Sequence, residues 1–343
     1  MSAPSPQPVL EIRDLAVDFA GPDGPVRVVD GVSLTLGAGE VLGLVGESGS
    51  GKSVTLLAVM GLLPAGARIA GGEVRFMGRR IDDAPETALQ ALRGGDMAMI
   101  FQDPMTSLNP VLRIGTQIGE AVALHNPDMG RRAIAARVVD LLALVGVPDP
   151  AARARQFPHE FSGGMRQRAM IAMAIANEPK LLIADEPTTA LDVTIQAQVM
   201  EVLEEVRART GSSMVLVTHD LGLVAETAQR IAVMYSGRIA EMAPTDTIFD
   251  RPAHPYTIGL LASLPSLDAD DADLPSIPGQ PPDMRHRPPG CAFHPRCALG
   301  EGRERCRTER PEATRLGGGR LAACHFAHEA ETGAAAPRAE AAG

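Results

Sequence analysis

The sequence predicts an α/β protein built on a mostly parallel sheet that is covered by helices on both faces. Two short apolar runs, LLIAD at 181–185 and MVLV at 214–217, are typical of strands buried on both sides in a parallel sheet. A helix-like segment at 195–210 lies between them, so strands and helices alternate along the chain. The length of 343 residues allows about two domains of ~150 residues.

Composition and charge exclude several classes of protein. The chain is 45% hydrophobic and 22% charged, which is typical of a folded globular protein and not of a disordered one. Its net charge of −10 argues against a general nucleic-acid binder. The longest windows without charge, 53–67 and 253–267, contain Pro and Gly and are shorter than the ~18 apolar residues of a membrane span. The N-terminus has no basic segment followed by an apolar one, so we expect no signal peptide and a cytoplasmic protein.

The first half of the chain is predicted to begin with strands and continue into helices. Alternating residues and Gly-rich turns predict strands at 9–19, 26–36, 40–46 and 71–81. The apolar segment 53–63 predicts a helix that ends at Pro64. From about residue 103 to 155 the pattern is mostly helical, with 133–146 as its clearest amphipathic stretch.

The second half adds helices at 165–177 and 195–210 and a further strand region at 231–242. Beyond residue 250 the chain changes character, because Pro and Gly become frequent and all the cysteines appear. We therefore predict a main domain at 9–250, a small Cys-rich extension at 251–330, and a disordered tail at 331–343.

A glycine-rich loop between a predicted strand and a predicted helix carries the clearest chemistry. Its pattern is GxxxxGKS, formed by Gly46, Glu47, Ser48, Gly49, Ser50, Gly51, Lys52 and Ser53, with Val54 following. Glycines let the backbone wrap closely, and successive N–H groups at a helix N-terminus point at phosphate oxygens. We predict that Lys52 bridges the β- and γ-phosphates of a nucleotide and that Ser53 gives its hydroxyl to Mg²⁺.

Two carboxylates, Asp185 and Glu186, end the apolar strand at 181–185. The tip of a buried strand is a suitable place for an acid that must coordinate Mg²⁺, and we assign this role to Asp185. Glu186 is then placed to polarise the water that attacks the γ-phosphate.

A second candidate anion site opens the helix predicted at 165–177. Ser162 is a natural N-cap, and Gly163 and Gly164 leave N–H groups free at a helix N-terminus. In isolation this segment indicates no more than the start of a helix.

Together these motifs resemble the nucleotide-binding subunit of an ATP-binding cassette (ABC) transporter. FSGGM at 161–165 resembles the family's LSGGQ signature, and the order of the motifs along the chain is the family's order. The resemblance covers roughly residues 9–250. It implies a RecA-like core with an antiparallel β subdomain and a helical subdomain at about 103–160, and an ATPase that uses ATP and Mg²⁺.

The resemblance also implies that two such subunits pair head to tail. The signature residues of one subunit, Ser162, Gly163, Gly164 and Met165, would then cover the ATP held by the phosphate loop of the other. Met165 departs from the family's Gln, which removes a polar contact to the nucleotide.

Four further residues resemble family positions. Gln102 corresponds to the Q-loop residue that senses Mg²⁺ and contacts the membrane subunit, and Asp192, in Ala190-Leu191-Asp192, to the D-loop at the dimer interface. His219 corresponds to the switch histidine, which contacts the γ-phosphate and supports Glu186. Phe19 corresponds to the aromatic residue that stacks on adenine, although a simple core Phe is nearly as good an interpretation. The implied catalytic set is Glu186, His219 and Gln102, and the implied Mg²⁺ set is Ser53, Gln102 and Asp185.

Narrower segments favour one branch of the family. FQDPMTSLNP, ALDVTIQAQV, HPYTIGLLASLP and IPGQPP resemble importers of dipeptides and oligopeptides, with nickel importers as close relatives. This implies a subunit that energises peptide import at the cytoplasmic face of the cell membrane. The implied partners are two permease subunits, an extracytoplasmic binding protein and a second, related ATPase subunit. The alternatives are an importer of nickel or another small solute, or a non-transport ABC ATPase that acts on nucleic acid or ribosomes.

The cysteines, Cys291, Cys297, Cys306 and Cys324, are spaced C-x5-C-x8-C-x17-C. Crowded cysteines in a cytosolic chain favour a metal site over disulfides, but the lack of a C-x2-C pair weakens a zinc ribbon. Four thiolates suit an iron–sulfur cluster, and the resemblance implies a 4Fe–4S site in this segment. We predict that cluster, with zinc or free thiols as the alternatives.

Overall fold

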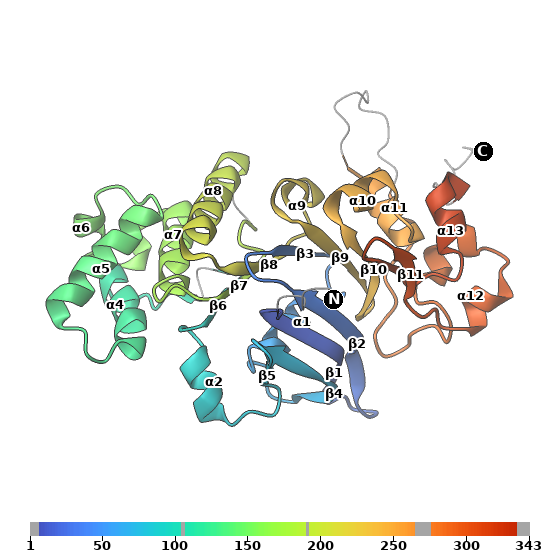
Figure 1. Cartoon of the computed structure of the whole chain (residues 1–343), viewed down its shortest axis with the longest axis horizontal. Coiled ribbons are helices and arrows are strands. Elements are labelled where there is room, and N and C mark those ends of the chain that lie inside the picture. The colour runs from blue at the N-terminus through green and yellow to red at the C-terminus, as the bar shows by residue number, and fades with distance from the viewer. Residues whose placement is uncertain (1–6, 104–106, 190–191, 265–275, 335–343) are drawn as a thin grey trace, which may run out of the picture.

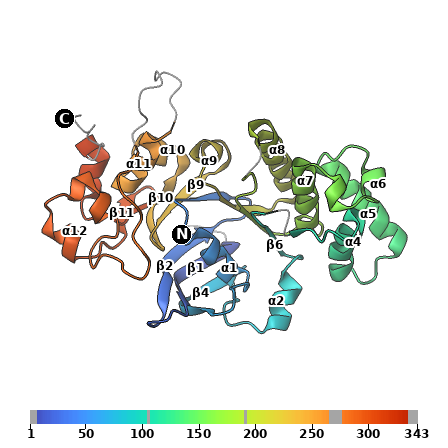
Figure 2. The same ribbon diagram turned by 180° about the vertical axis from the view of Figure 1, so that it is seen from behind.

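In a computed structural model of the chain, which describes residues 7–103, 107–189, 192–264 and 276–334, two sheets occupy the centre. A helical segment lies at one end of the molecule and the C-terminal extension lies at the other (Figure 1). The view from behind shows the same arrangement, with the smaller sheet packed beneath the larger one (Figure 2).

The larger sheet has eight strands in the order β11-β12-β10-β9-β3-β8-β7-β6. Its parallel part is formed by β6 (Met97–Ile100), β7 (Leu181–Asp185), β8 (Ser213–Val217), β3 (Val41–Val45) and β9 (Arg230–Tyr235). Every residue of β3, β6, β7 and β8 is buried, which explains their unbroken apolar runs. The prediction of an α/β fold on a mostly parallel sheet is confirmed.

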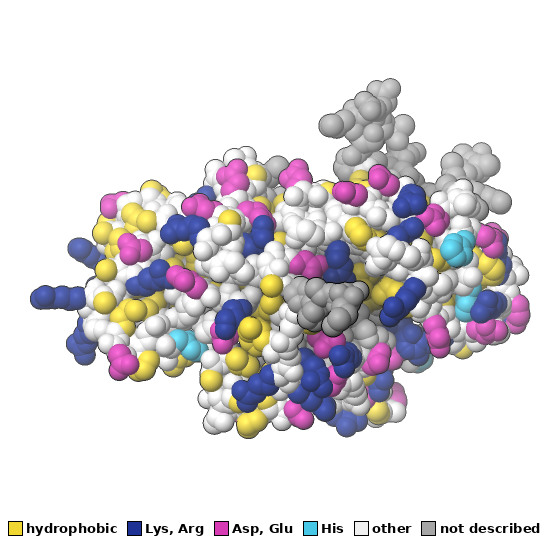
Figure 3. All heavy atoms as spheres, viewed as in Figure 1, with side chains coloured by type: hydrophobic (Ala, Val, Ile, Leu, Met, Phe, Trp, Pro, Cys, Tyr) yellow, Lys and Arg dark blue, Asp and Glu magenta, His cyan; other side chains and the backbone are white. Residues whose placement is uncertain are grey.

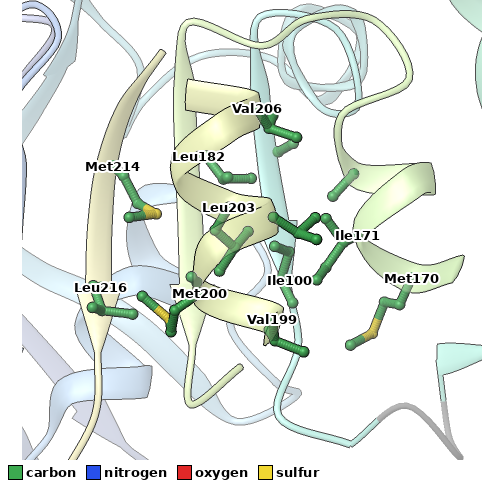
Figure 4. Packing of buried hydrophobic residues seen from close by; sticks show 14 of the residues in the cluster. Ile100, Met170, Ile171, Leu182, Val199, Met200, Leu203, Val206, Met214 and Leu216 are labelled. Carbon is green, nitrogen blue, oxygen red and sulfur yellow. The ribbon is translucent and has the colours of Figure 1, made fainter. Parts of the chain in front are cut away.

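Helices cover the parallel strands. Figure 4 shows α8 (Val193–Thr210) lying over the sheet beside α7 (Gly163–Ala174), with Val199, Leu203 and Val206 turned into the core. These three residues recur at helical spacing and are at most 1% exposed. α8 ends at Gly211, whose φ of 68° is the left-handed conformation that stops a helix.

The smaller sheet is antiparallel, in the order β2-β1-β4-β5. Its strands are β1 (Leu10–Phe19), β2 (Val26–Leu36), β4 (Ala67–Phe76) and β5 (Arg79–Arg80). The inward side chains of this sheet share one hydrophobic cluster with α1 (Lys52–Val59) and with one face of the large sheet. α2 (Glu86–Leu92) follows β5 along the chain.

The helical segment contains α4 (Ile114–His125), α5 (Arg131–Leu144), α6 (Pro150–Arg153) and a short 3₁₀ turn at Pro158–Glu160. Its apolar residues join the cluster on the other face of the large sheet. These helices lie within the region predicted to be helical, of which residues 104–106 are outside the described part of the chain.

The C-terminal extension is built onto the large sheet. β10 (Arg238–Pro244) pairs with β12 (Arg320–Ala322), which pairs in turn with β11 (Thr314–Gly317). Its helices are α10 (Thr245–Asp250), α11 (Pro255–Ala262), α12 (Glu304–Thr308) and α13 (Ala327–Glu329), with 3₁₀ turns at His294–Arg296 and Ala298–Gly300. Of the predicted tail, 331–334 belong to a helical turn at Ala330–Ala334, and 335–343 lie outside the described residues.

The surface is mixed in charge. On the face shown in Figure 3, basic and acidic side chains are interspersed, with several basic groups over the antiparallel sheet. There Arg13 and Arg75 pair with Glu73, and Arg80 pairs with Asp82. Among the described residues, no helix has the length and apolar character needed to cross a membrane.

Candidate nucleotide-binding site

The phosphate loop joins the centre of the parallel sheet to a helix. β3 runs into residues 46–51, and α1 begins at Lys52. Gly46 has φ 150° and a Cβ there would come 2.1 Å from the Met234 carbonyl oxygen, so only glycine fits. Gly51, with φ 105°, ends the loop in the left-handed region. The end of the central strand β3 and the first turn of α1 therefore fix the two ends of the loop.

Lys52 is held inside this loop. Its side chain is buried, and Nζ donates hydrogen bonds to the Gly46 carbonyl at 2.6 Å and the Glu47 carbonyl at 3.0 Å. Burial lowers the pKa of Lys52, while the nearby carboxylates of Glu186, Asp185 and Glu47 oppose that shift. The ammonium group lies where phosphate oxygens could replace the two carbonyls.

Ser53 and Asp185 link the loop to the strand tip. Ser53 Oγ donates to Asp185 Oδ1 at 3.1 Å, and Asp185 is buried at the end of β7. Burial raises the pKa of Asp185 and the charge of Glu186 adds to the rise, whereas Ser53 and Lys52 favour the ionised form. Two hard oxygen donors at this place fit the coordination chemistry of Mg²⁺.

Three side chains converge on one carboxylate oxygen of Glu186. Oε2 lies 2.7 Å from Thr189 Oγ1, 3.0 Å from Gln102 Nε2 and 3.7 Å from His219 Nδ1. Glu186 itself has φ 47°, a conformation that costs energy for a non-glycine residue and is typical of functional sites. The structure thus brings together Gln102, Glu186 and His219 and adds Thr189, which the motif pattern did not indicate.

The other residues predicted to bind nucleotide have varied surroundings. Ser48 and Gly49 are exposed, whereas Ser50 is buried and its Oγ has no hydrogen-bond partner among the described residues. Val54 and Phe19 are partly buried and pack against the cluster beneath the small sheet. Phe19 is the last residue of β1, between Val26 of β2 and Ala67 of β4, so it lies at one end of the strands of that sheet.

The signature and D-loop residues form helix caps. Ser162 caps α7, accepting a hydrogen bond from the Met165 N–H at 3.3 Å, and Asp192 caps α8, accepting one from Ile195 at 3.0 Å. Ser162, Gly163 and Asp192 are exposed, and a Cβ on Gly163 would meet nothing within 4 Å. Met165 instead packs against the large core cluster. Ala190 and Leu191 lie outside the described residues.

The extension reaches the phosphate loop, a contact that the sequence did not predict. Arg296 donates to both carboxylate oxygens of Glu47, and Tyr256 Oη accepts a hydrogen bond from the Glu47 N–H. These partners are 249 and 209 residues away from Glu47, so no local pattern could have indicated them.

The predicted metal centre in the extension is wrong. Within the described residues, no group of three or more His, Cys, Asp or Glu side chains is arranged to hold a metal ion. All four cysteines line one small cavity, which His254, Phe293 and Phe326 also border. The four cysteines are Cys291, Cys297, Cys306 and Cys324.

The four cysteines lie in largely apolar surroundings. Cys291 and Cys297 pack against the large core cluster, and Cys324 packs against a small apolar cluster around Ala253. Burial raises the pKa of Cys297 to about 11 and that of Cys324 to about 12. Cys297 Sγ accepts a hydrogen bond from the Gly300 N–H at 3.3 Å, and Cys324 Sγ accepts one from the Phe326 N–H at 3.4 Å.

Comparison with known protein families gives two matches. Residues 29–189 match the family described as ABC transporter. Residues 240–306 match the family described as oligopeptide/dipeptide transporter, C-terminal region. The second match begins within β10 and covers the extension up to residue 306, including three of the four cysteines.

Individual relatives extend the similarity over most of the chain. The dipeptide transport ATP-binding protein DppD of Bacillus subtilis is 51% identical over 84% of this chain and 86% of its own. The oligopeptide transport ATP-binding protein OppD of Salmonella typhimurium is 49% identical over 93% of this chain and 95% of its own. Among solved structures, a dimeric bacterial ABC transporter cassette superposes with a TM-score of 0.63 at 25% identity, covering 69% of this chain and 98% of that cassette.

Proposed function

Because the chain belongs to the family of ABC transporter ATP-binding proteins, in its oligopeptide and dipeptide branch, we propose that it hydrolyses ATP to drive the import of peptides. The observation that carries the proposal is the convergence of Gln102, Thr189 and His219 on Glu186 beside a phosphate loop. The peptide substrate is supported by relatives that are about half identical in sequence over most of the chain.

The hydrolytic mechanism follows from the chain's own side chains. Lys52 exchanges the carbonyls of Gly46 and Glu47 for oxygens of the β- and γ-phosphates. Ser53 and Asp185, together with Gln102, would hold Mg²⁺, and the bound ion would offset the charge of the phosphates. These groups stabilise the charge that develops as the γ-phosphoryl group is transferred.

Glu186 positions the attacking water. Its carboxylate accepts a hydrogen bond from that water, and the groups around Oε2 hold the carboxylate in one orientation. His219, which is 69% exposed and 3.7 Å from Glu186, is free to contact the γ-phosphate as well. Phe19, at the end of β1, stacks on the adenine ring.

The exposed helix caps support the proposal of a partner subunit. Ser162, Gly163 and Gly164 of one subunit cover the ATP on the phosphate loop of a second, related ATPase subunit, and Asp192 contacts that partner. Two permease subunits dock on the helical segment near Gln102, and an extracytoplasmic protein delivers the peptide. The chain therefore works at the cytoplasmic face of the cell membrane.

The test is peptide uptake by cells that lack this chain. Restoring the wild-type chain should restore uptake of radiolabelled dipeptides and oligopeptides, and restoring Glu186→Gln should not. Glu201→Gln, a matched change on the exposed side of α8, should behave as wild type. Restored uptake of nickel without uptake of peptides would refute the peptide substrate, and full uptake with Glu186→Gln would refute the assigned chemistry.

A further inference from the structure

Two residues of the C-terminal extension hold the second residue of the phosphate loop. Arg296 Nη1 and Nη2 donate to the two carboxylate oxygens of Glu47 at 2.8 and 3.0 Å, which is the bidentate geometry of a strong ion pair. Tyr256 Oη accepts from the Glu47 N–H at 2.8 Å. We propose that Arg296 and Tyr256 are positioning residues of the ATP site, through which the extension fixes the phosphate loop.

The extension is rigid enough for this role. Arg296 is 8% exposed and Tyr256 is fully buried. The rings of Tyr235, Tyr256 and Phe293 pack together with centroids 4.6 to 5.4 Å apart, and the Arg296 guanidinium lies 5.9 Å from the Tyr235 and Phe293 centroids. Arg296 Nε also donates to the Pro278 carbonyl at 2.8 Å, so the guanidinium is anchored on three sides.

Glu47 links Arg296 to Lys52 of the phosphate loop. Glu47 presents its side chain to Arg296 and its carbonyl oxygen to Lys52 Nζ at 3.0 Å. Although burial acts to lower the pKa of Arg296, its hydrogen bonds to Glu47 and Tyr235 raise it above the ordinary value. The guanidinium is therefore charged at any working pH, and a shift of the extension would move the backbone that Lys52 contacts.

Charge gives the contact a specific effect on ATP. Glu47 carries a negative charge within a loop that must receive a triphosphate, and this charge opposes binding unless it is neutralised. Arg296 neutralises it at contact distance, in a partly buried site where screening by salt is weak. Without Arg296, the loop would lose an anchor and present an unpaired carboxylate next to the phosphates.

Tyr256 acts on the backbone of the same residue. Burial raises the pKa of its phenol, so the hydroxyl remains protonated, and Oη accepts the Glu47 N–H. This hydrogen bond sets the direction of the peptide plane at the start of the loop. Because the ring is fully buried in the aromatic cluster, it cannot follow a mobile loop.

The inference rests on the proposed function, since it concerns the ATP site, and is tested by equilibrium binding on the full chain. The probe is a non-hydrolysable ATP analogue with Mg²⁺, measured by titration calorimetry. Arg296→Met should raise Kd by about tenfold, because the loop loses an anchor and keeps an unpaired carboxylate that repels the phosphates. Arg305→Met, which removes a 58% exposed arginine paired with Glu309 in the same extension, should leave Kd unchanged.

A double variant distinguishes the effect of the unpaired Glu47 charge from a general loss of structure. Adding Glu47→Gln to Arg296→Met should recover most of the lost affinity, because the unpaired charge is gone. Arg296→Lys should fall between wild type and Arg296→Met, since it keeps the charge but loses the bidentate geometry. If Arg296→Met proves unstable, Tyr256→Phe keeps the ring in place and should raise Kd by about threefold.

Several outcomes would overturn the inference. These are an unchanged Kd in folded Arg296→Met and Tyr256→Phe, or a double variant as weak as the single one. Lys52→Ala serves as the reference for a lost ATP site. If the wild-type chain binds the analogue no better than Lys52→Ala, the proposed function itself fails; if it binds normally and the extension variants do also, only the positioning role fails.

Discussion

At the scale of single residues, the arrangement around Glu186 determines what the site can do. Three neighbours approach the same oxygen, Oε2, and the backbone of Glu186 adopts a left-handed conformation that the surrounding structure must maintain. The Glu186 N–H donates to the Val217 carbonyl at 2.9 Å, which ties this conformation to the neighbouring strand β8. The carboxylate is thus placed before any nucleotide arrives.

Replacing the carboxylate should separate binding from hydrolysis. In Glu186→Gln the size of the side chain is retained, so ATP affinity should stay within a few-fold of wild type. Turnover should fall by about a hundredfold or more, because the amide is a poor acceptor for the proton of the attacking water. Steady-state phosphate release and ATP binding would check this, and hydrolysis within a few-fold of wild type would contradict the assigned role.

Thr189 should act by orienting Glu186. Thr189→Ala removes the 2.7 Å hydrogen bond to Oε2, so we expect kcat to fall by about fivefold with little change in KM. Thr189→Ser keeps the hydroxyl and should retain most of the activity. Equal loss in both variants would show that the methyl group and its packing matter instead of the hydrogen bond.

The cysteines should behave as buried thiols. The pKa of Cys297 is raised by burial from 9.0 to about 11, so between these pH values the folded chain retains a proton that the unfolded chain loses. The contribution of Cys297 to the free energy of unfolding should therefore be complete below pH 9 and should be lost as the pH rises to 11. Denaturant unfolding at pH 8 and pH 10 would measure this, and Cys297→Ala should show a weaker pH dependence.

Alkylation provides a direct check on the same thiols. At pH 8, iodoacetamide should modify native Cys297 and Cys324 much more slowly than the same residues in unfolded protein, because burial and a raised pKa both suppress the reactive thiolate. Equal rates in the native and unfolded protein would refute the burial of the thiols.

Residues that act through a contiguous motif could be predicted from the sequence, and residues that act across the fold could not. The phosphate loop and the Asp185-Glu186 pair follow from local patterns, and the structure places them side by side through Ser53 and Lys52. No sequence motif that we identified marks the roles of Thr189, Tyr256 and Arg296. These roles depend on the contacts that the fold creates with Glu186 and Glu47. The predicted metal site is wrong because closeness in sequence does not determine how side chains are arranged in space.

At the scale of elements, the start of α7 is the most informative. Ser162 and Gly163 at this cap are exposed to solvent. Capping the helix does not require this exposure, so the two residues are accessible to a partner. Ser162→Arg would place a bulky cation there. ATP binding to the isolated chain should be unchanged, since its own phosphate loop is intact, but hydrolysis by the assembled transporter should fall severalfold or more. Normal hydrolysis at both sites of the assembled complex would exclude pairing through this cap.

Element boundaries show where local patterns give too little information. The helix predicted at 53–63 ends at Val59, because Gly61 adopts φ 63° and turns the chain before Pro64 is reached. The strand predicted at 71–81 is two strands, β4 and β5, separated by a turn in which Met77 and Gly78 both have positive φ. In both places the element ends at a turn, and the spacing of apolar residues does not reveal where that turn lies.

At the scale of the whole molecule, one hydrophobic cluster crosses the boundary placed at residue 250. Tyr256 and Phe293 from the extension share it with Val233 and Tyr235 from the sheet. The full chain should therefore unfold in one calorimetric transition together with its extension. A chain ended after Asp250 should unfold about 10 °C or more lower, because it loses two buried aromatic side chains. Two separate transitions in the full chain would show instead that the extension is an independent domain.

Because β10 pairs with β12, which is synthesised about 80 residues later, the edge of β10 is unpaired in the nascent chain. Strand β3 pairs with β8 and β9, which are made much later, and the edge at Glu241 and Met242 stays open until Leu321 and Ala322 leave the ribosome. Open strand edges are templates for pairing with other chains. During synthesis, the incomplete protein therefore exposes the long edge of β10 to pairing with neighbouring nascent chains. The β11–β12 hairpin covers that edge and leaves only the four-residue strand β11 at the border of the sheet.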